Sequence, residues 1–117
     1  MSEEIREIYH SEEFEEYYRS LEPKIQEKYD YVEHIIRTQK VLNSKFVKKL
    51  DSTIFYEARI SIGSNEYRTV LFAIDSTNII ESKSVLFLNS FLKKKSTKQY
   101  KFEIKEAEGI LIRYKEE

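Results

Sequence analysis

The sequence predicts an α+β fold in which helices pack on one side of a mostly antiparallel sheet. Three observations predict it. Apolar residues recur at helical spacing between residues 12 and 36. Between residues 54 and 89 they form short runs rich in β-branched and aromatic residues, which are typical of strands. Helical spacing returns from about Thr97. We therefore expect one domain over residues 1–117, with the element order β-α-α-β-β-β-α.

The first half of the chain predicts a short strand followed by a helical hairpin. The strand falls within residues 2–10, and Ser11 suits the N-cap of the first helix because its hydroxyl can accept a bond from a free backbone N–H. Pro23 suits the first position of the second helix, where its missing N–H costs nothing. The apolar face of the first helix consists of Phe14, Tyr17, Tyr18 and Leu21. That of the second consists of Ile25, Tyr29, Val32, Ile35 and Ile36.

The second half predicts a three-stranded meander and a C-terminal helix. Strands are expected near residues 54–62, 66–75 and 79–89, after a polar connector over residues 39–45. Residues 46–50 suit a short helical turn or an irregular lead-in. The C-terminal helix has the apolar stripe Tyr100, Ile104, Ala107 and Leu111. Gly109 weakens this helix, so residues 110–114 could instead leave it as a short strand.

Two arginines, Arg59 and Arg68, lie on the first two strands of the meander. Their hairpin turn falls within residues 63–65, which tolerate positive φ. Either two-residue loop, 63–64 or 64–65, places both guanidinium groups on one face of the sheet, whereas a three-residue loop separates them. The Cβ atoms of the two arginines would then be roughly 5–8 Å apart. Two positive charges at this distance repel each other unless an anion or a carboxylate lies between them. Two interpretations follow: a phosphate-binding pair, or a surface network with Glu57 on the same face.

Charge is unevenly distributed, although the net charge is only −1. Residues 1–36 hold four Lys/Arg against eleven Asp/Glu, and residues 37–105 hold fourteen against six. The basic half contains a lysine cluster made of Lys93, Lys94, Lys95 and Lys98. A basic segment that also carries arginines on a sheet indicates a polyanionic partner. The alternative interpretation of the lysine cluster is a solvated turn before a helix.

Several kinds of site are excluded by composition. The chain has no cysteine, so it has no disulfide and no thiolate metal site, and its two histidines are too separated for a zinc site. It shows no phosphate-binding loop, dinucleotide fingerprint or Ser/His/Asp set. It also lacks a signal peptide and an apolar run of membrane-spanning length. We therefore expect a cytoplasmic protein with no membrane contact, no cofactor and no metal.

Arginine and lysine side chains can assist the cleavage of RNA without a metal. The reaction requires activation of the 2′-oxygen, neutralisation of the charged transition state and protonation of the leaving 5′-oxygen. Arg59 and Arg68 could supply the second requirement by bidentate contacts. Lysines crowded by other cations have lowered pKa values and could take part in proton transfer.

Several segments together resemble the RelE/ParE toxin superfamily, and in particular its phage-derived HigB-like branch. They are the opening Ile8-Tyr-His-Ser-Glu-Glu-Phe14, then Phe55-Tyr-Glu-Ala-Arg59-Ile, Tyr67-Arg68-Thr-Val-Leu-Phe-Ala-Ile-Asp75 and Leu88-Asn-Ser-Phe91-Leu-Lys-Lys. The resemblance covers nearly the whole chain in the same order. It implies a RelE-like fold with an N-terminal helical hairpin. It also implies that Arg59, Arg68, Lys93 and Lys94 are catalytic, and that Lys95, Lys98 and Phe91 contact RNA.

The same resemblance implies the toxin of a type II toxin-antitoxin system, acting as a ribosome-dependent mRNA endoribonuclease that inhibits translation. The implied partners are the ribosome and its mRNA, and a helix-turn-helix antitoxin that covers or distorts the Arg59/Arg68 face. The complex with the antitoxin is expected to bind operator DNA. The chain departs from the family at residues 95–100, which lack the usual proline, and has no counterpart of the aspartate and histidine described for some relatives. The alternatives are a ParE-like inhibitor of DNA gyrase and an inactive antitoxin-binding module.

Overall fold

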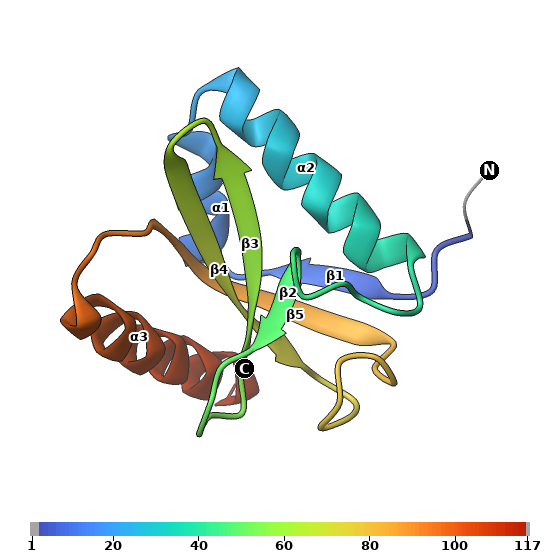
Figure 1. Ribbon diagram of the computed structural model, residues 1–117. Coiled ribbons are helices and arrows are strands. Elements are labelled where there is room, and N and C mark those ends of the chain that lie inside the picture. The colour runs from blue at the N-terminus through green and yellow to red at the C-terminus, as the bar shows by residue number, and fades with distance from the viewer. Residues whose placement is uncertain (1–2, 117) are drawn as a thin grey trace.

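The computed structural model describes residues 3–116 and has an α+β fold with three helices and a five-stranded sheet (Figure 1). The observed order is β-α-α-β-β-β-β-α, one strand more than the sequence predicts. The elements are β1 (Glu7–His10), α1 (Glu12–Arg19), α2 (Pro23–Thr38), β2 (Val47–Lys49), β3 (Tyr56–Ile62), β4 (Asn65–Ala73), β5 (Ser84–Leu92) and α3 (Thr97–Glu116).

The sheet has the strand order β1-β5-β4-β3-β2. Strands β2 to β5 pair antiparallel with their neighbours, whereas β1 pairs parallel with β5, from Glu7 opposite Ser84 to His10 opposite Phe87. The sheet is therefore mostly antiparallel, as predicted. Its one parallel edge brings the start of the chain beside its last strand.

Helices cover both faces of this sheet, so the prediction that they share one side is wrong (Figure 1). The α1–α2 hairpin packs on the face that carries Tyr67, Leu71 and Phe87, and α3 packs on the face that carries Val70 and Leu88. The reason is that β4 and β5 are apolar on both faces and both must be shielded from water.

The expected helix starts are confirmed. Ser11 precedes α1 with an extended backbone, and its hydroxyl accepts a bond from the Phe14 N–H at 3.0 Å. The same hydroxyl donates to the Leu88 carbonyl, which ties the cap to β5. Pro23 is the first residue of α2. Helix α3 runs through Gly109 to Glu116, so the alternative of a strand over residues 110–114 is wrong. Ile110 and Leu111 are buried, and their packing holds this part of the helix in place.

The strand boundaries differ from the prediction at two places. Residues 46–50 contain β2, which pairs with β3 from Val47 opposite Ala58 to Lys49 opposite Tyr56. The last strand begins at Ser84 rather than at residue 79 and extends to Leu92. Ile79 is instead a buried loop residue, 3% exposed, whose carbonyl accepts a bond from the Arg6 side chain.

A β-bulge in β5 determines which way its last residues face. Thr69 pairs with Ser90 and Leu71 with Phe87, so Leu88 and Asn89 together oppose Val70. The extra residue reverses the alternation of side chains along β5. As a result Phe91 lies on the α3 face with Leu88, rather than on the face of the helical hairpin.

Asp75 orders the turn that leads into β5, and its pKa should be measurably low. The Ser82 hydroxyl donates to its carboxylate, and the Lys83 and Ser84 backbone N–H groups donate at 3.0 Å. These bonds lower the pKa of Asp75 from 3.8 to about 2. Because the folded pKa is depressed, the stabilisation is present above about pH 4 and is lost as the pH falls through about 2.

An NMR titration of the Asp75 carboxyl carbon should give a midpoint near 2. Ser82→Ala should raise that midpoint, because it removes the largest contribution. A midpoint near 4 in the unsubstituted protein would contradict this account of the turn.

Candidate functional site

Arg59, Arg68 and Phe91 form a row across three neighbouring strands. Arg59 pairs directly with Arg68, and Arg68 pairs with Phe91. The hairpin closes with Ile62 opposite Asn65, so its loop is Gly63–Ser64, one of the two-residue loops left open by the sequence. Gly63 has φ +58°, a conformation that glycine adopts without steric cost. The register therefore places both guanidinium groups on one face.

Glu57 lies between the two arginines, as the network interpretation predicts. Its Oε1 is 3.5 Å from the Arg59 Nε and 3.8 Å from the Arg68 Nε. Its other oxygen accepts a bond of 2.8 Å from the Tyr100 hydroxyl on α3. Burial, followed by this bond to Glu57, raises the pKa of Tyr100 to about 12. Tyr100 therefore stays protonated at neutral pH and acts as a donor.

Arg68 is buried rather than exposed, whereas both interpretations of the sequence place the two arginines at the surface, so they are wrong on this point for Arg68. Its side chain is 2% exposed, whereas that of Arg59 is 31% exposed. Its guanidinium donates to the Tyr67 carbonyl at 2.9 Å and to Glu66 at 3.3 Å, and its Nε has no hydrogen-bond partner among the described residues. The cause is α3, which covers this face of the sheet.

Three of the four predicted lysines, Lys93, Lys94 and Lys95, line an open groove next to this network. The groove has a volume of about 510 Å³ and lies between the β3–β4 turn and the segment that joins β5 to α3. Backbone and side-chain bonds fix that segment: Lys93 N–H donates to the Glu66 carbonyl, and Lys94 N–H to the Gln99 side chain. We call this the lysine groove; it is lined by Ser64, Asn65, Glu66, Leu92, Lys93, Lys94, Lys95, Ser96, Thr97 and Tyr100.

Two residues predicted to contact RNA do not line this groove. Phe91 is 5% exposed and packs edge-on against Tyr100, with ring centroids 5.6 Å apart. Phe91 is therefore a packing residue in this structure, and its ring is not free to stack on a base. Lys98 is exposed in the first turn of α3 but is not among the lining residues. Lys93, Lys94 and Lys95 are all exposed at the groove.

Tyr100 and Glu66 belong to the site although the sequence did not single them out. Tyr100 fitted the apolar stripe of the C-terminal helix, and only the placement of α3 over Glu57 gives its hydroxyl a role. Glu66 accepts from Arg68 and lines the groove. A hydrogen bond from Ser61, followed by the bond from Arg68, lowers its pKa. Glu66 is therefore ionised and only weakly basic at neutral pH.

Neither histidine lies in the groove. His10 bonds to Glu33 at 2.5 Å across β1 and α2, and His34 is exposed on α2. Within residues 3–116, no three histidine or carboxylate side chains are grouped as the ligands of a metal ion would be. No helix of the described chain is both long and apolar enough to cross a membrane.

Comparison with known proteins returns no assignment. No protein-family model matches the chain, and no curated protein and no solved structure matches it significantly.

Proposed function

We propose that this protein is a RelE-like toxin of a type II toxin-antitoxin system, of the HigB-like branch, and cleaves mRNA on the ribosome without a metal ion. The observation that carries the proposal is the lysine groove, which places Lys93, Lys94 and Lys95 beside Tyr100 and the buried Arg68–Glu57 pair. The motif resemblance described above and the α+β element order support it. In this proposal the protein acts in the cytoplasm, and a helix-turn-helix antitoxin neutralises it.

The groove can perform part of the chemistry of RNA cleavage. The 2′-hydroxyl gives up its proton to a base, and its oxygen attacks phosphorus. The bond to the 5′-oxygen breaks, the 5′-oxygen takes a proton from water, and the products are a cyclic phosphate and a 5′-hydroxyl. Negative charge builds up on the phosphate oxygens, where Lys93 and Lys94 can neutralise it. Tyr100 donates its single hydroxyl proton to Glu57 and so holds that carboxylate in place beside the groove.

In the part of the chain that the structure describes, the site has no carboxylate that is well placed to act as the general base of RNA cleavage. The two carboxylates at or beneath the groove are Glu66, whose pKa is lowered, and Glu57, which is 5% exposed and held by Tyr100 and both arginines. Neither is well suited to remove a proton quickly. The substrate must therefore be held in a reactive geometry by something else, and in this proposal the ribosome does so.

The burial of Arg68 favours one alternative function. Its guanidinium is already bonded to Glu66 and the Tyr67 carbonyl, so it cannot grip a phosphate without a rearrangement of α3. A protein of this fold that binds its antitoxin but does not cut RNA would have such an arrangement.

Translating ribosomes provide the test. Purified protein should cut a translated mRNA in the ribosomal A site and leave the same mRNA intact without ribosomes, as mapped by primer extension. Lys93→Ala/Lys94→Ala should slow cleavage by about tenfold or more, because two charges beside the phosphate are lost. The matched control is Lys101→Ala/Lys105→Ala, which removes two exposed lysines of α3 outside the groove.

Three outcomes would contradict the proposal. Efficient cutting of free RNA would show a complete, autonomous site. Equal effects of the two double substitutions would remove the groove from the mechanism. Induced expression that halts DNA synthesis before protein synthesis would favour a gyrase inhibitor, whereas no growth arrest and no cleavage would favour the binding module.

A further inference from the structure

Strand β3 has an outer edge that no other strand covers along its second half. Strand β2 pairs only with Tyr56–Ala58, and the last bond on that side is from the Arg59 N–H to the Phe46 carbonyl at 2.8 Å. Among the described residues, no strand lies beyond this point beside residues 60–62. The uncovered edge is about 10 Å long at about 3.3 Å per residue.

The backbone of Ser61 points toward this open side. Inward and outward hydrogen bonding alternates along an antiparallel strand. Because Arg59 bonds outward to Phe46, Ser61, two residues further on, presents its N–H and C=O in the same direction. These are the groups that an added strand would pair with.

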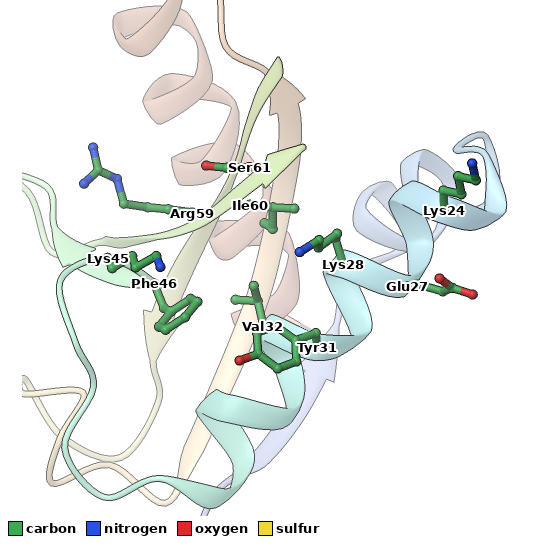
Figure 2. A pocket seen from close by; sticks show the side chains of 10 residues that line it. All are labelled: Lys24, Glu27, Lys28, Tyr31, Val32, Lys45, Phe46, Arg59, Ile60 and Ser61. Atoms are coloured by element: carbon green, nitrogen blue, oxygen red, sulfur yellow. The ribbon is translucent and has the colours of Figure 1, made fainter. Parts of the chain in front are cut away.

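A groove runs along this edge, between β3 and α2. It has a volume of about 590 Å³, and Figure 2 shows Ile60, Val32 and Phe46 gathered between the two elements. Tyr31 adds an exposed aromatic ring at the rim, 54% exposed, which packs edge-on against Phe46 at 6.1 Å between centroids. The groove therefore offers apolar surface beside the unpaired backbone.

The rim of this groove is strongly basic. Lys24, Lys28, Lys45 and Arg59 line it, against the single carboxylate of Glu27. Within residues 3–116, the ion pairs use Arg59, through Glu57, but none of the three lysines. Lysines beside an edge strand repel a second copy of the same edge, but they attract a chain that carries carboxylates.

We propose that the β3 edge and its groove bind an extended acidic segment of a partner polypeptide, which adds a strand beside Ser61. Those side chains of the segment that point toward α2 include both kinds needed here: apolar ones lie against Phe46 and Tyr31, and carboxylates pair with Lys24, Lys28 and Lys45. The outward N–H and C=O of Ser61 favour a peptide over RNA, because a peptide backbone supplies an acceptor and a donor at strand spacing that pair with both groups at once. This surface differs from the lysine groove, and the proposal stands whether or not the protein cuts RNA.

The probe is a fluorescein-labelled ten-residue peptide with threonine at every second position and with glutamate and valine in turn at the positions between, so that one strand face carries both. Its binding to the protein is measured by fluorescence anisotropy. Lys24→Glu/Lys28→Glu should weaken binding by at least about tenfold, because two attractive charges become repulsive. Lys101→Glu/Lys105→Glu is the matched control: it reverses two exposed lysines with the same spacing on α3 and should leave binding nearly unchanged. Both pairs lie on helix surfaces, so both variants should fold.

Ser61→Pro tests the strand pairing itself. Proline removes the outward N–H and is tolerated on an edge strand, whereas Ser61→Ala keeps the N–H. Only Ser61→Pro should abolish binding, and hydrogen exchange of the Ser61 amide should slow by about tenfold or more when the peptide is bound.

Equal weakening by the two lysine pairs, or an unchanged exchange rate at Ser61, would overturn the proposal. So would a labelled ten-residue uridine oligonucleotide that binds more tightly than the peptide and competes with it, since the groove would then be an RNA site.

Discussion

Replacing Arg6 by methionine is expected to lower the free energy of unfolding by about 3–5 kcal/mol, because several buried carbonyls lose their donor at roughly 1–3 kcal/mol each. Arg6 is 2% exposed, and its five N–H groups reach five backbone carbonyls. Three of these belong to the end of α2 and the residues after it, and two to the loop before β5. The distances to the carbonyls of Ile36, Gln39, Lys40, Ile79 and Ile80 are 2.9, 2.6, 2.8, 3.1 and 3.2 Å.

The large effect follows from the lack of any substitute for these bonds. Methionine fills a similar space but donates nothing, so buried carbonyls lose their partners. The C-terminal end of α2 also loses a cation that its dipole favours. Lysine at this position should recover only part of the lost free energy of unfolding. Its ammonium group is compact and cannot bond to both segments at once, as the planar guanidinium group does.

Urea unfolding followed by circular dichroism measures the change. Arg19→Met is the control, because Arg19 is 67% exposed and its ion pair with Glu15 should contribute less than about 1 kcal/mol. A loss below 1 kcal/mol for Arg6→Met would show that water replaces the arginine and that the two segments are held by other contacts.

The second large effect is expected at Arg68. Arg68→Met should destabilise the fold by about 3 kcal/mol or more, because it leaves Glu57 buried with one fewer cation. An exposed arginine at this position would contribute only about 0–1 kcal/mol to the free energy of unfolding. Loss of toxicity in an Arg68 variant would therefore report on folding before it reported on catalysis.

A double-mutant cycle separates the two roles. If the cost arises from the unpaired carboxylate, Glu57→Leu/Arg68→Met should be less destabilised than Arg68→Met alone. Arg59→Met is the comparison on the same carboxylate, and it should cost less because Arg59 is partly exposed. Additive effects of the Glu57 and Arg68 substitutions would show that the pair is not coupled.

The local elements of this fold could be predicted from the sequence because their signals are local. Ser11 and Pro23 mark helix starts by their own chemistry, and the stripe from Phe14 to Leu21 has helical spacing. The position of the turn within residues 63–65 could be predicted, but its register could not, since more than one loop fits the same residues. The pairing of Glu57 with both arginines followed from strand alternation alone.

What could not be predicted depends on contacts between distant segments. Strand β2 is three residues long and carries two lysines, so only its pairing with β3 makes it a strand. The bulge at Leu88 and Asn89 leaves no mark in the pattern, yet it decides which way Phe91 faces. The burial of Arg68 depends on α3 crossing the face opposite the helical hairpin. A charged residue in the sequence of a strand does not indicate that a distant helix will pack over it.

The parallel pairing of β1 with β5 has a consequence for how the chain is made. Residues 7–10 leave the ribosome early, but their partners at residues 84–87 leave it late. The helical hairpin can form from neighbouring residues while synthesis continues, whereas the first strand must wait for the last one. Residues 7–10 therefore cannot pair in the sheet until residues 84–87 have emerged. The lysine groove, lined by residues between 64 and 100, cannot form before residue 100 has emerged.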